Sequence, residues 1–167
     1  MFIKIILTLI SAAASRAIPQ ETVSRSRSRP TQIYSRTGHH MDISQSGSVI
    51  PSRSRPGLLS LLELVPISDR PGNFIIHGIV TGLYVKVKPG NRKLHGVFDQ
   101  SDATIFTLEE ISDNFQSFKL SKKPNCRLLV SRNQYRVRCS PVKKSNKISF
   151  LSRRSHFPRF SSYARHF

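Results

Sequence analysis

The chain has 167 residues, of which 38% are hydrophobic and 8% aromatic, which suits one domain with a buried core and excludes a fully disordered chain. Lys and Arg outnumber Asp and Glu by 27 to 9, so the net charge is +18. Such a charge attracts nucleic acid, anionic lipid and sulfated polysaccharide alike, because Coulomb attraction and counterion release depend on charge density more than on chemistry.

The N-terminal stretch 1–17, MFIKIILTLISAAASRA, has the parts of a secretory signal peptide: an early lysine, an apolar run and small residues before Ala17. The apolar run is too short to span a bilayer, and no later run approaches that length. We therefore expect a secreted, extracellular protein with no membrane span. The alternative is an apolar N-terminal helix that is not removed.

The next segment, 18–31, is polar and low in complexity, so we expect a disordered Arg/Ser-rich arm. Its run Arg25-Ser26-Arg27-Ser28-Arg29 also resembles the Ser/Arg tracts of nuclear RNA-associated proteins. That resemblance conflicts with the export signal.

Beyond the arm, short apolar or alternating runs are separated by turn residues, which predicts an all-β fold. The expected strands are 32–35, 40–43, 48–51, 58–65, 74–79, 83–87, 93–97, 104–110, 115–120, 127–131, 135–139 and 148–152. Pro89-Gly90-Asn91 predicts a hairpin turn, because Pro presets φ while Gly and Asn accept positive φ.

A repeat within the sequence makes the predicted fold more specific. Thr37-Gly38 opens one strand-turn-strand unit, Thr81-Gly82 opens a second, and a third begins near Asn125; the openings and the closing strands are spaced by roughly 44 residues. Three copies of a four-strand unit predict a β-trefoil of twelve strands in three repeats over residues 32–152, followed by a basic disordered tail at 153–167. The closing strands are expected to point these residues into the core: Leu59, Leu62, Leu64, Ile105, Leu108, Ile148 and Phe150.

Two cysteines do not make a disulfide framework. If a tight hairpin turns at Arg132-Asn133, Cys126 faces Cys139 and a cross-strand disulfide can form. A shift of one residue in the turn would separate them, which leaves two free thiols as the alternative.

The stretch 76–96, IHGIVTGLYVKVKPGNRKLHG, resembles the middle repeat of the fibroblast growth factors, and the resemblance extends over about residues 32–151. The matching positions are Gly78, Val80, Gly82, Leu83, Tyr84, Leu94 and Gly96. Ala103 stands where the family has a cysteine. The resemblance implies a secreted ligand that binds heparan sulfate and activates a receptor tyrosine kinase, with heparan sulfate as co-ligand and no cofactor.

Two sets of residues carry that implied function. The heparan-sulfate set is Arg36, Arg132, Arg136, Lys143, Lys144 and Lys147, whose Arg forks and Lys charges suit sulfate groups. The receptor set is Tyr34, Glu109, Asn114, Phe115 and Leu151, a mixed apolar and polar patch where the two ends of the domain meet. Phe115 replaces a tyrosine of the family and so removes one hydroxyl.

Catalysis is not predicted, because the His, Cys and carboxylate residues show no catalytic, metal-ligand or phosphate-loop spacing. The adjacent pair His39-His40 is expected to form no metal site, because neighbours on a strand point to opposite faces and a pair in a loop is usually solvated. The family resemblance therefore leads us to expect a heparin-binding growth factor that does not bind nucleic acid. The alternatives are a secreted trefoil lectin or cytokine that activates no receptor, and an intracellular basic protein that binds nucleic acid.

Overall fold

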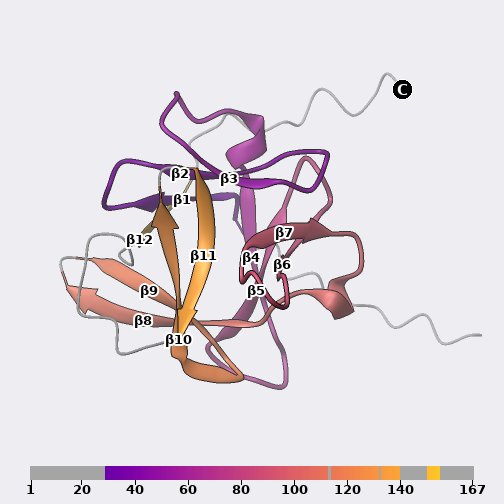
Figure 1. Ribbon diagram of the computed structural model, residues 1–167, viewed down its shortest axis with the longest axis vertical. Coiled ribbons are helices and arrows are strands. Elements are labelled where there is room, and N and C mark those ends of the chain that lie inside the picture. The colour runs from indigo at the N-terminus through magenta and orange to yellow at the C-terminus, as the bar shows by residue number, and fades with distance from the viewer. Residues whose placement is uncertain (1–28, 113, 132, 140–149, 155–167) are drawn as a thin grey trace, which may run out of the picture.

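The computed structural model describes residues 29–112, 114–131, 133–139 and 150–154 (Figure 1). Short alternating runs form strands here, as the sequence predicts. The strands are β1 (Thr31–Ser35), β2 (His40–Ile43), β3 (Val49–Ser52), β4 (Leu62–Pro66), β5 (Asn73–Gly78), β6 (Tyr84–Val87), β7 (Leu94–Val97), β8 (Phe106–Ser112), β9 (Phe115–Leu120), β10 (Lys123–Ser131), β11 (Gln134–Cys139) and β12 (Phe150–Arg154).

Two 3-10 turns, η1 (Leu58–Ser60) and η2 (Gln100–Asp102), are the helical elements of the described ranges. No helix in this part of the chain has the length and apolar character needed to cross a membrane. The all-β prediction is confirmed, with twelve strands in one antiparallel sheet.

Six strands pair in a closed ring, in which β1 pairs with β4, β4 with β5, β5 with β8, β8 with β9, β9 with β12, and β12 with β1. The other six form the hairpins β2–β3, β6–β7 and β10–β11, each joined to the ring by its first strand. The hairpins also meet one another, since Ser48 bridges to His95 and Lys93 bridges to Arg136. Segments far apart in sequence are therefore neighbours both in the ring and among the hairpins.

The core lies inside the ring. Each strand of the ring contributes one hydrophobic residue that is 0% exposed: Ile33, Leu62, Ile76, Phe106, Phe118 and Phe150. Phe118 is the centre of an aromatic cluster, with ring centroids 5.6 Å from Phe74, 6.4 Å from Phe106 and 5.5 Å from Phe150, all in edge-on geometry. Edge-on packing is the favoured arrangement of aromatic pairs, so this cluster stabilises the closed ring.

The predicted strand 58–65 is partly wrong. Its first residues form η1, because Pro56-Gly57 precedes a turn in which the Ser60 and Leu61 N–H groups donate to the carbonyls of Gly57 and Leu58. Leu59 is consequently 38% exposed and not in the core. Leu62 is buried and Leu64 packs against the core, as predicted.

The other two closing strands also depart from the expected core. In β8 the buried residue is Phe106 in place of Ile105, since Phe106 and Leu108 share one face of the strand and Ile105 lies before it, half-buried. Ile148 lies outside the described residues. The final strand β12 runs to Arg154, beyond the predicted domain end at 152.

The hairpin turn after β6 uses its residues differently from the prediction. Gly90 adopts positive φ, but the second such residue is Arg92 (φ 55°) and not Asn91. Asn91 contributes through its side chain, whose Oδ1 accepts a hydrogen bond from the Lys93 N–H at 3.0 Å. A short polar side chain stabilises a turn in this way without a left-handed backbone.

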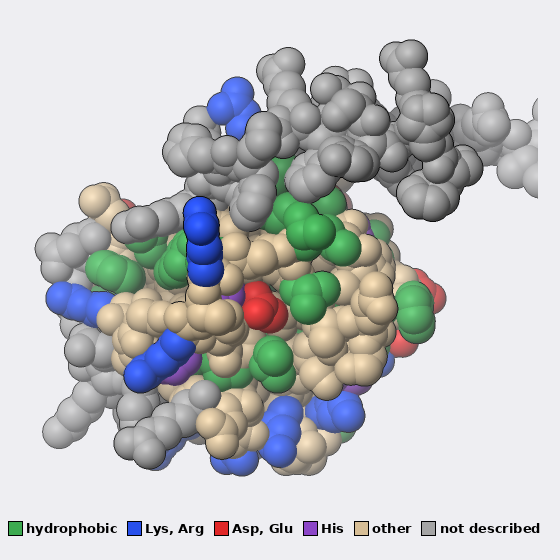
Figure 2. All heavy atoms as spheres, turned by 90° about the horizontal axis from the view of Figure 1, so that it is seen from above, with side chains coloured by type: hydrophobic (Ala, Val, Ile, Leu, Met, Phe, Trp, Pro, Cys, Tyr) green, Lys and Arg blue, Asp and Glu red, His purple; other side chains and the backbone are tan. Residues whose placement is uncertain are grey.

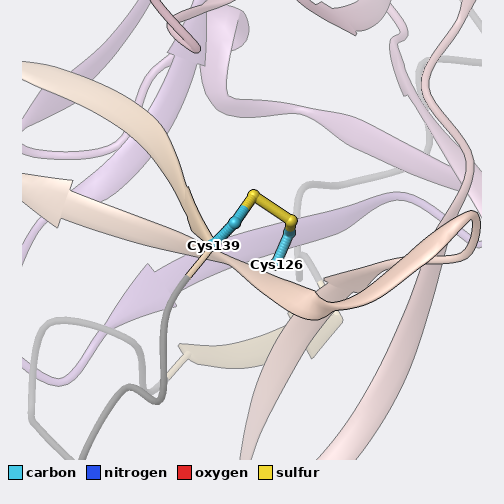
Figure 3. The surroundings of a disulfide bond; sticks show 2 residues. All are labelled: Cys126 and Cys139. Atoms are coloured by element: carbon cyan, nitrogen blue, oxygen red, sulfur yellow. A yellow bond between two sulfur atoms is a disulfide. The ribbon is translucent and has the colours of Figure 1, made fainter.

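Cys126 and Cys139 form a disulfide between β10 and β11 (Figure 3). Ser131 pairs with Gln134, and the same register places the two cysteines directly opposite each other. The two-residue turn therefore has the length that the disulfide requires. Both thiols are consumed, so the free-thiol alternative does not describe this structure.

Candidate functional site

Three residues of the predicted receptor set lie side by side on the outside of the ring. Tyr34 in β1 is directly opposite Leu151 in β12. Phe150 is opposite Gln116, so the antiparallel register brings Leu151 next to Phe115 in β9. Because Ile33 and Phe150 point into the core, alternation turns their neighbours outward. We call Tyr34, Leu151 and Phe115 the outer row; each is half-buried.

Arg36, predicted to bind heparan sulfate, contacts this outer row. Its guanidinium carbon lies 5.2 Å from the centre of the Phe115 ring. A cation over an aromatic face contributes about 0.5–1 kcal/mol at an exposed site. Arg36 is itself exposed, so the outer row carries a positive charge at the Phe115 end.

At the other end of the outer row, Tyr34 makes a hydrogen bond and a ring contact within the protein. The Tyr34 hydroxyl donates to Gln32 Oε1 at 2.9 Å, and the Tyr34 ring centroid is 6.1 Å from that of His40. The tyrosine is therefore held in one orientation, with part of its ring exposed. Side chains fixed before binding lose less entropy on association.

Glu109 stands one strand further around the ring, opposite Ser117. Lys119 Nζ lies 2.8 Å from Glu109 Oε1, and Arg127 donates to Oε2 at 3.0 and 3.3 Å. The hydrogen bond from Lys119 lowers the pKa of Glu109 most, and Arg127 lowers it further, against the opposing effect of burial. Its charge is thus already matched within the protein, and a receptor cation would have to share this carboxylate.

Asn114 precedes Phe115 and is exposed, with φ of 66°. Asn tolerates the left-handed conformation better than most residues, so the turn before β9 explains this asparagine by itself. Its position next to the outer row also leaves its amide accessible to a partner.

Of the predicted heparan-sulfate set, the structure describes Arg36 and Arg136. Arg132, Lys143, Lys144 and Lys147 lie outside the described residues. Arg136 is exposed on β11 opposite Lys93, whereas Arg36 lies on Phe115, so the two described members contact different surfaces. Figure 2 shows basic side chains spread over one face, with hydrophobic side chains between them.

Sequence reasoning missed a second group of cations. Lys88, Arg92 and Lys93 lie around the turn between β6 and β7, and Lys122 and Lys123 lie at the turn between β9 and β10. The signal was present in the sequence, because Lys88 and the pair Arg92-Lys93 flank the predicted hairpin turn.

Both histidines of the adjacent pair are buried, His39 at 5% and His40 at 2% exposed, so the solvated-loop alternative does not describe them. Arg53 donates to His39 Nε2 at 2.9 Å, and His40 Nε2 lies 3.2 Å from Asp42 Oδ1. Burial, followed by Arg53 and His40, lowers the pKa of His39. Within the described ranges, no group of three His, Cys, Asp or Glu side chains could hold a metal ion.

No protein-family model matches this sequence. No curated protein is significantly similar to it.

Proposed function

We propose that this protein is a secreted, fibroblast-growth-factor-like ligand that binds heparan sulfate and activates a cell-surface receptor tyrosine kinase. The ligand contributes binding energy and geometry, and the kinase domain of the receptor produces the signal. Heparan sulfate raises the local concentration of the ligand and brings two receptors onto one chain. The fold we propose for it is a β-trefoil.

Recurring positions along the strands support the trefoil. Leu62, Phe106 and Phe150 are fully buried at intervals of 44 residues, each in the strand that ends a four-strand unit. Ile33, Ile76 and Phe118, also fully buried, occupy the strands that begin the units. Each unit thus supplies two strands to the ring and one hairpin, as three trefoil repeats would.

The turns after the first strands of two units also correspond. Gly38 and Gly82 both have positive φ. The Ser35 N–H donates to the His39 carbonyl at 2.7 Å, and the Gly78 N–H donates to the Leu83 carbonyl at 2.8 Å. The second turn is one residue longer than the first, but in both a positive-φ glycine directly precedes the residue whose carbonyl accepts the hydrogen bond, which favours repetition of one unit over chance similarity.

The outer row is the observation that carries the receptor proposal. Tyr34, Leu151 and Phe115 come from β1, β12 and β9, so the beginning and the end of the domain meet at this surface. The family resemblance implies receptor contacts at these same residues. Partly exposed aromatic and aliphatic side chains in one row supply the apolar anchors on which interfaces depend.

A cellular assay tests the proposal. Purified protein, with its N-terminus sequenced, is applied to cells that carry fibroblast growth factor receptors, with and without added heparin, and receptor phosphorylation is followed. We expect phosphorylation that heparin increases. A folded protein that gives no phosphorylation in either condition would contradict the proposal.

The pairing of Glu109 with Lys119 and Arg127 favours one alternative function. If the Glu109 carboxylate pairs only with Lys119 and Arg127, it does not pair with a receptor cation. Phe115 also lacks the hydroxyl of the tyrosine found in the family, so the receptor contact would be weaker. The protein would then be a secreted glycan-binding trefoil without receptor activation. This alternative predicts that the protein binds heparin with full affinity in the assay above while the receptor stays unphosphorylated.

A further inference from the structure

The tip of the β6–β7 hairpin concentrates positive charge. Lys88 and Lys93 face each other across the turn, where the Lys88 N–H donates to the Lys93 carbonyl at 2.8 Å. The Arg92 N–H donates to the Lys88 carbonyl at 3.1 Å. All three side chains are exposed, so three cations project from one tight turn.

Two cavities flank this tip. One, of about 440 Å³, lies where the three hairpins meet and is lined by Lys88, Lys93 and His95 together with Ser46, Ser48, Asn91, Asn133 and Gln134. The other, of about 640 Å³, lies toward the β9–β10 turn and is lined by Lys88, Arg92, Lys122 and Lys123 beside apolar side chains. No Asp or Glu is among the described residues that line either cavity.

The charges at this surface are not matched by the carboxylates that the structure describes. Lys93 stands opposite Arg136 in an antiparallel bridge, and like charges directly opposite destabilise strand pairing. Ion pairs among the described residues lie elsewhere, for example between Lys86 and Asp102, between Arg70 and Asp69, and between Glu109 and its two basic neighbours. An anionic ligand would relieve the repulsion that remains.

The pKa of His95, which lines the cavity between the hairpins, is lowered. Burial lowers its pKa most, followed by the charges of Lys88 and Lys86. Its Nδ1 lies 3.0 Å from the Lys86 carbonyl. Burial disfavours a charge of either sign on His95, while Lys88 and Lys86 disfavour a further positive charge at this cavity.

Backbone contacts hold the tip in place. The Val137 N–H donates to the Arg92 carbonyl at 2.9 Å, and the Gly96 N–H donates to the Gly47 carbonyl at 2.7 Å. A Cβ at Gly96 would come within 2.9 Å of the Leu83 side chain, so glycine permits this close approach. The cations thus project from a turn whose backbone is fixed to two neighbouring hairpins.

We infer that the β6–β7 tip and its two flanking cavities bind a linear sulfated polysaccharide, on a surface that adjoins Arg136 of the predicted heparan-sulfate set. The inference rests on the proposed glycan-binding function and adds a contact surface to it. Lys and Arg side chains contact the sulfates, while Ser, Asn and Gln side chains offer hydrogen bonds to sugar hydroxyls.

The lining residues favour a glycan over a nucleic acid. Proteins that bind single strands stack bases on exposed aromatic side chains. Among the described residues lining the two cavities, Tyr135 is 1% exposed, and the only other aromatic ring is the half-buried imidazole of His95. The described part of this surface therefore offers charge and hydrogen bonds but no exposed Phe, Tyr or Trp on which bases could stack.

The test compares full-length variants for affinity to a heparin dodecasaccharide at physiological salt. The tip variant carries Lys88→Gln, Arg92→Gln and Lys93→Gln. The control carries Arg29→Gln, Arg55→Gln and Arg70→Gln, which neutralise the same number of exposed charges elsewhere. Circular dichroism and thermal unfolding confirm that each variant is folded.

We expect the tip variant to lose affinity about tenfold more than the control, and its plot of log affinity against log salt to become shallower by roughly two. Equal losses in the two variants would overturn the inference. Displacement of heparin by a single-stranded oligonucleotide at lower concentration than by free dodecasaccharide would also overturn it, in favour of nucleic acid.

A third variant separates this inference from the proposed function. If Lys143→Gln, Lys144→Gln and Lys147→Gln abolish heparin binding while the tip variant behaves like the control, the tip surface is refuted and the growth-factor proposal stands. If the wild-type protein binds heparin through the tip but leaves the receptor unphosphorylated, the tip surface stands and the growth-factor proposal is refuted.

Discussion

Replacing Phe118 by alanine should remove much of the stability of the fold. The side chain is fully buried and packs edge-on against three other phenylalanines. Truncation of a buried Phe costs about 3–5 kcal/mol, and each lost aromatic pair accounts for about 0.5–1.5 kcal/mol beyond area burial. Because truncation removes three aromatic pairs together with a fully buried ring, we expect Phe118→Ala to cost about 4 kcal/mol.

The measurement is urea-induced unfolding followed by circular dichroism, since the chain has no Trp to report by fluorescence. Phe98→Ala is the matched control, because Phe98 is 83% exposed. Surface substitutions usually change stability by less than about 0.5 kcal/mol, and Phe98→Ala should do the same. A loss below about 1.5 kcal/mol for Phe118→Ala, or equal losses in the two variants, would refute the placement of Phe118 at the centre of the core.

Two further predictions concern the disulfide and the buried histidines. Replacing Cys126 and Cys139 by alanine should cost about 3 kcal/mol in urea unfolding, because the bond closes a loop with a sequence separation of 13; an unchanged midpoint would contradict this. Since the pKa values of His39 and His95 are lowered from 6.5, the unfolded state binds more protons, and stability should fall as the pH is lowered from 7 through about 6.5. Thermal unfolding across this range should show a shallower decrease for His95→Gln, and an identical slope would count against the assignment.

The strands and their pairing partners could be predicted to a large extent, because alternation and turn residues are local signals. The predicted bounds of 40–43 and 115–120 coincide with β2 and β9. The errors occur where the local sequence is compatible with two different choices of inward-facing residues. In 104–110 both Ile105 and Phe106 could begin an inward-facing series, and only packing against Phe118 and Phe74 selects Phe106.

The candidate site was harder to predict, because its contacts join distant segments. Arg36 was assigned to the heparan-sulfate set through the family resemblance, yet it lies on Phe115 of the distant strand β9. His39 accepts a hydrogen bond from Arg53, which comes after the next hairpin. The cations around the β6–β7 turn line a shared cavity because three hairpins meet there in the folded chain, and this meeting is not visible in the sequence. The charge of each residue is known from the sequence, but the residues that surround it in space are determined by the tertiary fold.

The most direct test of the account is binding of the purified protein to the ectodomain of a fibroblast growth factor receptor in the presence of heparin, measured by surface plasmon resonance. The account predicts saturable binding that Leu151→Ala and Phe115→Ala each weaken by about tenfold, because both remove anchors of the outer row, while Phe98→Ala leaves it unchanged. Heparin binding without any ectodomain binding by the folded wild-type protein would contradict the account.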